Sequence, residues 1–414
     1  MDFLPDNPEE GQNSTYLDEN AERFTPEQGG LLPLSGLDLL EQLRIRGSEL
    51  GLVRVGATPA EPFVEARAAF ERWLGKSYAG TMQYLSELGD RCDPRRLLPN
   101  ARTVVVVAMP TAGAIEGPVP NGCGEIADYA LGLDYHIALR GRIKRLCQAM
   151  ADYAGRPVWA RPCVDTAPLL EREAARRAGI GFIAKSTMLI VPGLGPRLML
   201  GAVVTDLELP AGEPMETRCG RCTLCLDACP TRAFAGPFEL DARKCISYLT
   251  IEHQGEISSE LRKNIGVRLV GCDVCQSVCP YDRIQSSHVM PTDNAPRSLL
   301  VHPNLKRWLQ MSSTEYRRIT KRTALRRLGR VQLMRNAAVA MGNSRDRAHL
   351  ASLLHAVHRD KSEIVRAHAA WAIGEIASDG EWVEAANALS EALDAQESPW
   401  VREELRIALT RLRA

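Results

Sequence analysis

The sequence predicts an α/β domain, then a module built around closely spaced cysteines, then an all-α domain of HEAT-like repeats. Three observations support this architecture. Strand and helix signals alternate as far as about residue 210, and eight cysteines fall between residues 219 and 279. After that, strand signals vanish and a helical motif recurs. With 414 residues, of which 45% are hydrophobic and 25% charged, the chain is long enough for more than one core.

Residues 1–33 are predicted to form a disordered, acidic extension. The first 30 residues contain eight acidic side chains and a single base, Arg23, among prolines, glycines and asparagines. They lack the basic start and apolar middle of a secretion signal, and no apolar run in the chain is long enough to cross a membrane. We therefore expect a cytoplasmic protein without membrane contact. In that compartment, tight runs of cysteines favour metal binding over disulfides.

Residues 34–212 are predicted to form the α/β domain. The run TVVVVAMP at 103–110 is typical of a strand that is buried on both faces. No GxGxxG follows a strand and no GxxxxGK[ST] occurs, which excludes the usual dinucleotide and P-loop sites. The remaining elements are expected to be helices at 37–50, 136–153 and 168–178, a strand at 51–56, and two or three short strands within 178–205.

The cysteine-rich module is predicted to span residues 213–295. Its first run, CGRCTLCLDACP, has the CxxCxxCxxxCP spacing of bacterial ferredoxins with two [4Fe–4S] clusters. In that arrangement the first three thiolates bind one cluster and the fourth binds the other. The second run, GCDVCQSVCP, contains only three cysteines. We predict that Cys245, in RKCISYL, supplies the ligand that the second run lacks.

Exchange of the last ligands then gives two sets of four thiolates. The sets are Cys219, Cys222, Cys225 and Cys279 for cluster one, and Cys229, Cys245, Cys272 and Cys275 for cluster two. Two zinc sites are the alternative, although zinc modules rarely need two CxxxCP endings. The other cysteines lack a pairing pattern and are expected to be ordinary thiols: Cys92, Cys123, Cys147 and Cys163.

Residues 296–414 are predicted to form the HEAT-like domain. An apolar-apolar-Arg motif recurs at Arg335, Arg366 and Arg402, a period that suits stacked helix pairs, with three unrelated amphipathic helices as the alternative. Segment 306–335 contains ten bases and one acid, Glu315, so we expect it to bind a polyanion. The bases are Lys306, Arg307, Arg317, Arg318, Lys321, Arg322, Arg326, Arg327, Arg330 and Arg335.

Several stretches together resemble the epoxyqueuosine reductases. They are LGLDYH, VDTAPLLEREAARRAGIGFIAKSTMLI, the two cysteine runs, CISYLTIEHQG and AAWAIGEIA, in that order from about residue 37 onward. The resemblance implies an α/β domain that binds cobalamin, as in reductive dehalogenases, two [4Fe–4S] clusters, and a helical domain that binds tRNA. It also implies the last step of queuosine synthesis, in which epoxyqueuosine at the wobble position of tRNA is deoxygenated to queuosine.

The resemblance also implies roles for individual residues. Asp165 would give a proton to the departing alkoxide, and its pKa would have to be raised to hold that proton near pH 7. Judged without the resemblance, Asp165 or Thr166 is an N-cap for a helix beginning near Pro168. The cobalamin contacts implied are Arg91, Asp165, Lys185, Leu189, Leu200, Ile246 and Gln254. The alternative for the three apolar side chains is plain core, which is as well supported as the contact for Leu200, and the alternative for Arg91 is a surface arginine.

One stretch departs from the family. A serine or cysteine, often followed by a basic residue, is expected where Ala127 and Asp128 stand, so no contact is assigned to these two. Asp134 is a second candidate acid, unless it pairs with Arg140 or caps a helix. His136 is expected to be structural or to face the substrate, with no protein histidine on the cobalt.

The partners that the resemblance implies are a tRNA with a GUN anticodon carrying epoxyqueuosine, and a low-potential electron donor of the flavodoxin or ferredoxin type. We expect the protein to be a monomer. Two other functions compete with this interpretation. One is a ferredoxin-like electron-transfer adaptor without a corrinoid, and the other is a reductive dehalogenase, a class that usually has a twin-arginine export signal and no basic helical tail.

Overall fold

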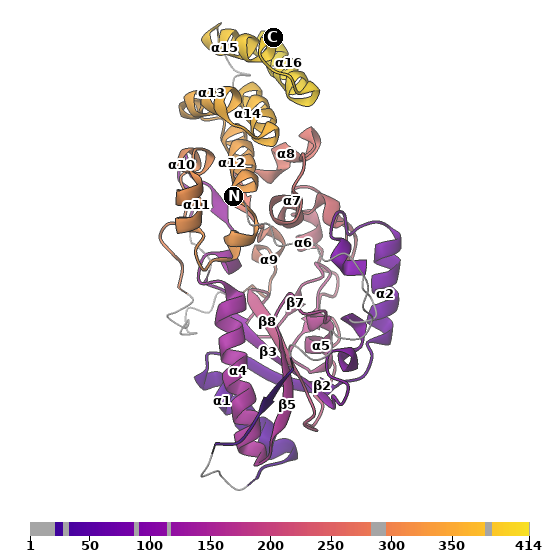
Figure 1. Ribbon diagram of the computed structural model, residues 1–414. Helices are drawn as coiled ribbons and strands as arrows, with labels where there is room; N and C mark the ends of the chain where they lie inside the picture. Colours follow the sequence, from indigo (N-terminus) through magenta and orange to yellow (C-terminus); the bar gives the residue numbers. More distant parts are fainter. Residues whose placement is uncertain are drawn as a thin grey trace, which may run out of the picture.

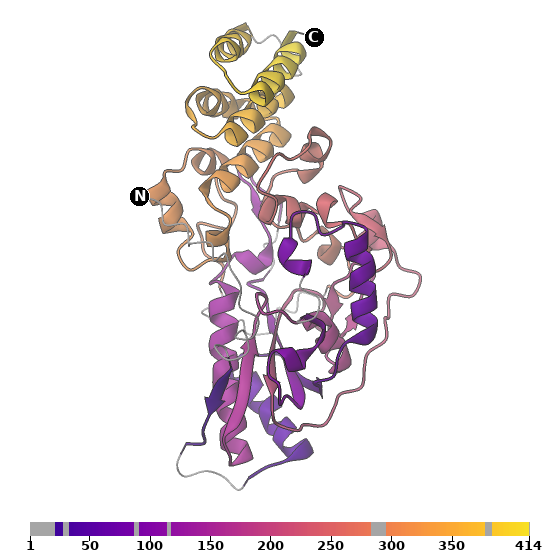
Figure 2. The same ribbon diagram turned by 45° about the vertical axis from the view of Figure 1, so that its right-hand side comes forward.

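The computed structural model describes residues 21–27, 33–86, 91–113, 117–282, 295–376 and 383–413. The α/β domain lies at one end of the molecule, the helical domain lies at the other, and the cysteine-rich module lies between them in both views (Figures 1 and 2). Within the described ranges, no helix is long and apolar enough to span a membrane.

A five-stranded antiparallel sheet forms the centre of the α/β domain. In sheet order its strands are β1 (Glu22–Phe24), β5 (Val158–Cys163), β8 (Leu198–Thr205), β3 (Thr103–Pro110) and β2 (Arg54–Pro59), and its helices are α1 (Gly36–Glu49), α2 (Val64–Gly75), α4 (Tyr135–Ala154) and α5 (Glu171–Arg177). Alternate residues of β3 enter two hydrophobic cores, one shared with α1 and α4 and the other with α5. The prediction of a strand buried on both faces is therefore confirmed.

Residues 22–24 form the edge strand β1, so the expectation of disorder was wrong for this stretch. The strand pairs with β5, and the side chain of Gln148 donates a hydrogen bond to the carbonyl of Thr25. An uncovered β5 would expose a row of unpaired backbone groups at the sheet edge. The extension thus protects the sheet, while residues 1–20 and 28–32 lie outside the described residues.

The cysteine-rich module consists of short elements. They are α6 (Leu224–Asp227), β9 (Phe234–Gly236), β10 (Glu239–Leu240), α7 (Ile246–Ile251), α8 (Ser259–Ile265), β11 (Arg268–Val270) and α9 (Val274–Ser277). Helix α6 packs against α9, which brings the two cysteine runs side by side. Strand β4 (Glu125–Ile126) of the preceding domain pairs in parallel with β11, and the two-residue strands β6 (Phe182–Ile183) and β7 (Leu189–Ile190) form a hairpin ahead of β8.

The C-terminal domain is all helical, as predicted. Its helices are α10 (Leu305–Leu309), α11 (Ser313–Ile319), α12 (Arg330–Ser344), α13 (Leu350–Arg359), α14 (Glu363–Ile376), α15 (Val383–Asp394) and α16 (Pro399–Arg413). Helix α12 packs on α14 and α14 on α16, and these three contain the recurring arginine motif. One hydrophobic core extends from Ile246 in the module to Trp371 and Leu405, so the module and the helices are packed as one unit.

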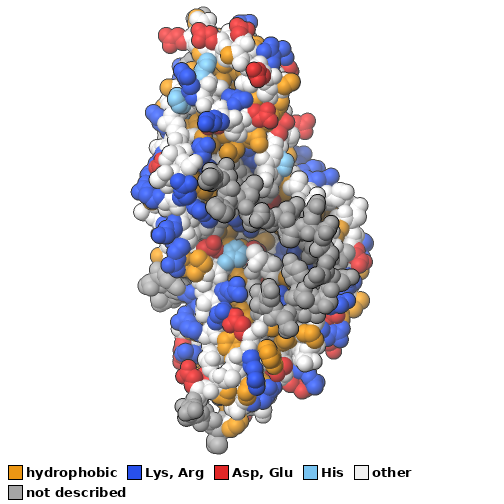
Figure 3. Space-filling view, in the orientation of Figure 1, with side chains coloured by type: hydrophobic (Ala, Val, Ile, Leu, Met, Phe, Trp, Pro, Cys, Tyr) orange, Lys and Arg blue, Asp and Glu red, His pale blue; other side chains and the backbone are white. Residues whose placement is uncertain are grey.

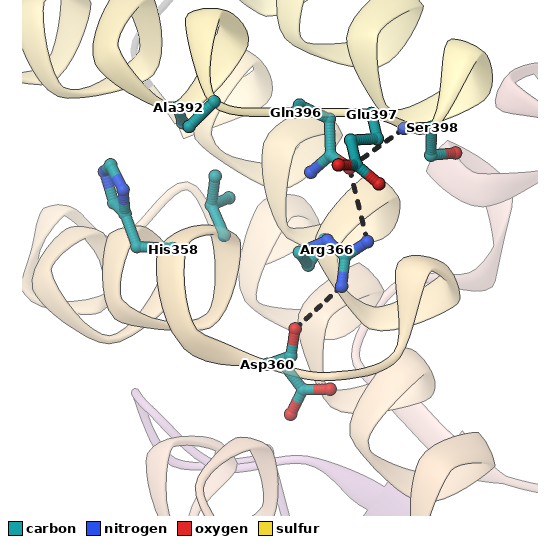
Figure 4. A pocket seen from close by; sticks show the side chains of 9 residues that line it. His358, Asp360, Arg366, Ala392, Gln396, Glu397 and Ser398 are labelled. Atoms are coloured by element: carbon teal, nitrogen blue, oxygen red, sulfur yellow. Dashed lines mark hydrogen bonds between the residues drawn. The ribbon is translucent and has the colours of Figure 1, made fainter.

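The arginines of the motif bind backbone carbonyls. Arg335 is fully buried and donates to the carbonyl oxygens of Leu249, His253 and Gly255 in the module, so the expectation that it faces a polyanion was wrong. Arg366 donates to the carbonyl of Asp360 at 2.8 Å beside a cavity of about 410 Å³ between successive helix pairs (Figure 4). These bonds give the motif a structural role.

Candidate active site

Asp165 lies where the three parts of the chain meet. It follows β5, and its Oδ2 is 3.1 Å from Nε2 of His136 in α4. The guanidinium of Arg327, in a 3₁₀ turn before α12, lies 3.9 Å from the same oxygen. Arg327 also forms an ion pair with Glu252, which follows α7 of the cysteine-rich module. Each part therefore contributes a charged side chain to one site.

The backbone of Asp165 is held in an unusual conformation. Its φ is +53°, in the left-handed region that costs a residue other than glycine about 1–2 kcal/mol. The N–H of Asp165 donates to Oε1 of Glu171 at 2.7 Å, which helps to hold this turn. Helix α5 begins at Glu171 with Leu170 as its N-cap, so the alternative that Asp165 or Thr166 caps this helix is wrong.

Asp134, His136 and Asp165 form a chain of hydrogen-bonding groups. Asp134 caps α4, where its Oδ1 accepts from the backbone N–H of His136 at 3.0 Å. The same oxygen lies 2.8 Å from Nδ1 of the His136 ring, whose other nitrogen reaches Asp165. The imidazole thus bridges two carboxylates, and Tyr135 also hydrogen-bonds to Asp165. Asp134 orients the histidine through this cap, which is the structural role the sequence left open for it.

The proton of this chain resides on the histidine. Burial opposes the shift, but hydrogen bonds from His136 and Tyr135 and the charge of Arg327 lower the pKa of Asp165, so the expected rise was wrong. Burial likewise opposes the shift at His136, yet its bonds to Asp134 and Asp165 raise its pKa to about 9. At pH 7 the pair is therefore an imidazolium beside a carboxylate.

Arg91 belongs to the same site as Asp165. Burial and the carboxylates of Glu252 and Asp165 raise the pKa of Tyr84, while Arg327 and Arg91 oppose the rise, so all five side chains are electrostatic neighbours. The guanidinium of Arg91 lies 5.5 Å from the centre of the Tyr84 ring and donates to the Tyr84 carbonyl at 3.2 Å. Its Nε is buried and has no hydrogen-bond partner among the described residues. A polar group of a ligand could accept from it.

The other residues implied to contact cobalamin differ in how accessible their side chains are. The side chains of Leu189 and Ile246 are buried in separate hydrophobic cores, and Leu200 is half-buried. Lys185 Nζ donates to the carbonyls of Gly220 at 2.7 Å and Cys222 at 3.0 Å, in the loop of the first cysteine run. Gln254 is exposed.

The seven cysteines of the two runs, together with Cys245, fall into two groups of neighbours. In one, burial and then the nearby thiols of Cys219 and Cys222 raise the pKa of Cys225 and Cys279. In the other, burial raises the pKa of Cys245, Cys272 and Cys275, with neighbouring thiols adding to the effect. Within this second group, Cys229 lies near Cys245, Cys245 lies near Cys272, and all three lie near Cys275.

These groups match the two sets expected from the spacing. In the described part of the chain, no three His, Cys, Asp or Glu side chains are arranged to hold one metal ion. A zinc ion needs four ligand atoms within about 2.3 Å of a single point, whereas a four-iron cube spreads its thiolates over a larger volume.

Arg197 joins the module to the α/β domain. Its Nε donates to Asp282 at 2.9 Å and its Nη2 donates to the hydroxyl of Ser277 at 2.9 Å, both near the second cysteine run. It also pairs with Asp128, one of the two residues at which the sequence departs from the family pattern. Asp128 is therefore a structural partner of Arg197.

The basic segment is largely open to solvent. Of its ten bases, eight are exposed, Arg330 is partly buried and Arg335 is buried. Lys and Arg side chains line the edge of the molecule at the height of α10 and α11 (Figure 3). The carbonyl of Arg322 accepts from the N–H of Asp134 at 2.9 Å, which places this segment directly beside the start of α4. The basic segment thus adjoins Asp165.

Comparisons with known proteins identify the family. Residues 91–166 match the family described as epoxyqueuosine reductase QueG, residues 218–282 match a 4Fe-4S double cluster binding domain, and residues 306–410 match HEAT repeats. The epoxyqueuosine reductase of Escherichia coli (strain K12) is 37% identical over 350 residues, which cover 83% of this chain and 91% of that protein. The chain belongs to the epoxyqueuosine reductases. The epoxyqueuosine reductase of Pseudomonas aeruginosa is 38% identical over 358 residues, which cover 84% of this chain and 97% of that protein.

Solved epoxyqueuosine reductases have the same fold. A crystal structure of one with an epoxyqueuosine-modified tRNA-Tyr stem loop has a TM-score of 0.84 and 30% identity, and covers 91% of this chain and 99% of that one. The Bacillus subtilis enzyme, with its catalytic loop swung out of the active site, has a TM-score of 0.82 at 30% identity. The predictions of an oxidoreductase of this family and of a double-cluster domain are confirmed.

Sequence reasoning missed three residues of this epoxyqueuosine reductase site. Tyr135 and Glu252 lie inside DYH and IEHQG, two stretches that carry the resemblance, and could have been found there. Arg327 had no signal of its own among ten similar bases, since only the fold shows that it reaches Asp165.

Proposed function

We propose that this chain reduces epoxyqueuosine in tRNA to queuosine, with cobalamin and two [4Fe–4S] clusters as cofactors. The observation that supports this most strongly is the site around Asp165. His136 of the α/β domain, Glu252 of the cysteine-rich module and Arg327 of the basic segment all contribute to it. The reaction adds two electrons and two protons and releases the epoxide oxygen as water, leaving a cyclopentene. Cobalamin, when bound and reduced, supplies a strongly nucleophilic cobalt suited to opening an epoxide.

Cobalamin would be held from the α/β side of the site. The buried Nε–H of Arg91, which lacks a partner among the described residues, can donate to an amide or phosphate oxygen of the cofactor. Leu200 offers a half-buried apolar surface on β8, and Gln254 an exposed amide. The residues present therefore fit a large polar ring with apolar faces.

The clusters would deliver electrons one at a time. Cluster one would use Cys219, Cys222, Cys225 and Cys279, and cluster two Cys229, Cys245, Cys272 and Cys275. Cys245 directly precedes α7, and Glu252 directly follows it. Because six helical residues span about 9 Å, cluster two would lie close to the site and act as the last relay.

The protons would come through His136 and Asp165. The imidazolium of His136 can pass its proton to the carboxylate 3.1 Å away as the alkoxide departs. Asp134 fixes the ring, and Arg327 keeps Asp165 from holding a proton before the alkoxide forms. His136 is thus the reservoir for the first proton and takes up another from solvent for the second, and Asp165 is the group that meets the substrate.

The basic segment would bind the tRNA backbone. Its exposed bases can neutralise phosphates without reading sequence, while the wobble base has to leave the stack to reach Asp165. The nearness of Arg322 to Asp134 supports this, because a strand bound along the segment would pass the site.

Metal and corrinoid analysis tests the cofactor set. Protein purified without oxygen and incubated with cobalamin is expected to retain about eight iron atoms and one cobalt per chain. Arg91→Ala should keep the iron and lose most of the cobalt, as read from the corrinoid absorbance. Retention of iron without any corrinoid in the wild-type protein would instead support an electron-transfer adaptor.

A further inference from the structure

The two predicted clusters differ in their access to solvent. Every residue from 216 to 224 except Cys219 and Cys222 is exposed, so cluster one would lie under an open loop. Around the ligands of cluster two, Arg243 and Lys244 before Cys245 are exposed, but Ile246 after it and the stretches 248–250 and 269–271 are buried. Because electron transfer weakens steeply with distance, electrons from outside would enter at cluster one.

Unpaired charge and exposed apolar side chains surround this entry point. Leu224 is 50% exposed and Phe238 is 46% exposed, so two large apolar side chains are open to solvent near this loop. Arg218 and Arg221, each next to a ligand of cluster one, are exposed, and neither forms an ion pair within the described residues. We call Arg218, Arg221, Leu224 and Phe238 the cluster-one patch.

The patch is held together as a surface. Lys185 donates to two carbonyls of the loop at Gly220 and Cys222, and its own carbonyl accepts from the N–H of Phe238 at 2.9 Å. Among the described residues, the acids nearest in sequence form no ion pair with these arginines: Glu216 lies 3.9 Å from Arg176, and Asp227 accepts from the hydroxyl of Thr223. The two guanidinium groups thus stay available to a partner.

We propose that the cluster-one patch is the docking surface for a small acidic redox protein, which gives one electron to cluster one in each encounter. An apolar centre with charge at its rim suits a transient complex that forms fast and separates. The donor is oxidised by one electron each time, so two encounters serve each epoxide. This inference rests on the proposed function, because it assigns a partner to the same electron relay.

Charge reversal tests the patch. We would compare the wild type, the double variant Arg218→Glu with Arg221→Glu, and Arg102→Glu as a matched control. Arg102 precedes β3 at the end of the sheet away from Arg197 and is also exposed. Each protein would be driven by reduced flavodoxin, as the acidic donor, and separately by dithionite with methyl viologen.

The double variant is expected to raise KM for flavodoxin about tenfold or more, while iron content and viologen-driven turnover stay within twofold of the wild type. The control should match the wild type with both donors. In the wild type, flavodoxin-driven turnover should also fall as salt rises. An unchanged KM of the double variant for flavodoxin would overturn the proposed docking surface. So would a flavodoxin-driven rate of the wild type that does not change with salt. A wild type inactive with viologen would instead count against the proposed function.

Discussion

His136→Gln removes the proton that the active site stores. In the folded protein the pKa of His136 is raised from 6.5 to about 9, a shift worth about 3 kcal/mol before solvent screening. Because a quarter of this side chain is exposed, about 1–2 kcal/mol of that survives as stability. The raised pKa means that the stabilisation is fully present below pH 6.5 and is lost as the pH rises through 9.

The variant should therefore show two linked effects. Its free energy of unfolding should be lower than that of the wild type by about 1–2 kcal/mol at pH 6, and the difference should vanish near pH 10. Its single-turnover reduction of an epoxyqueuosine stem loop at pH 8 should fall about 100-fold or more, because Asp165 has lost its proton source.

The assay uses a chemical reductant, so that delivery of electrons does not limit the rate, and mass spectrometry of the digested nucleosides. The wild-type rate should decline above about pH 9, where His136 loses its proton. His358→Gln, an exposed histidine in α13, is the matched control. A variant with wild-type rate and pH profile, or a stability deficit that persists at pH 10, would refute the proton store.

Three further predictions follow from the same site and fold. Asp165→Asn should keep iron and corrinoid but lose two to four orders of magnitude in rate, and the pKa of His136 should move back toward 6.5 in a nuclear magnetic resonance titration. A rate near that of the wild type would mean that another group protonates the alkoxide. Cys245→Ala should leave cluster one intact and cluster two labile, so that electron paramagnetic resonance finds one normal [4Fe–4S] signal; two normal signals would mean that a different residue is the eighth ligand. Deletion of residues 1–20 should leave stability unchanged, whereas deletion of 1–33 should lower the free energy of unfolding by about 1–3 kcal/mol and promote association through β5. Equal stability of the two truncations, measured by urea denaturation, would show that β1 contributes nothing.

The sequence predicted those parts of the fold that depend on local pattern. The valine run of β3 is apolar at every position, so both of its faces have to be buried, and the three helices with the arginine motif share a recurring apolar-apolar-Arg pattern. Cysteine spacing is equally local, because the cluster geometry restricts which residues along a turn can act as ligands. These features need no knowledge of what packs against them.

The features that were missed depend on contacts between distant segments. Strand β1 lies in an acidic stretch without strand pattern and exists because β5 offers it an edge. Arg335 looks like any other base in its segment, and only the three carbonyls of the module explain its burial. The downward shift of the Asp165 pKa depends on His136 and Arg327, which are far from Asp165 in the sequence. Burial alone, which the sequence suggested, would have raised it.

The measurement that tests the central claim most directly is a single-turnover reaction of the anaerobic, cobalamin-loaded protein with an epoxyqueuosine-modified stem loop. With excess reductant, one queuosine should form per chain. Omission of cobalamin or loss of iron should abolish it, and Asp165→Asn should slow its formation by about two to four orders of magnitude. Unchanged epoxyqueuosine in the presence of full iron and cobalt, with the stem loop bound, would contradict the account.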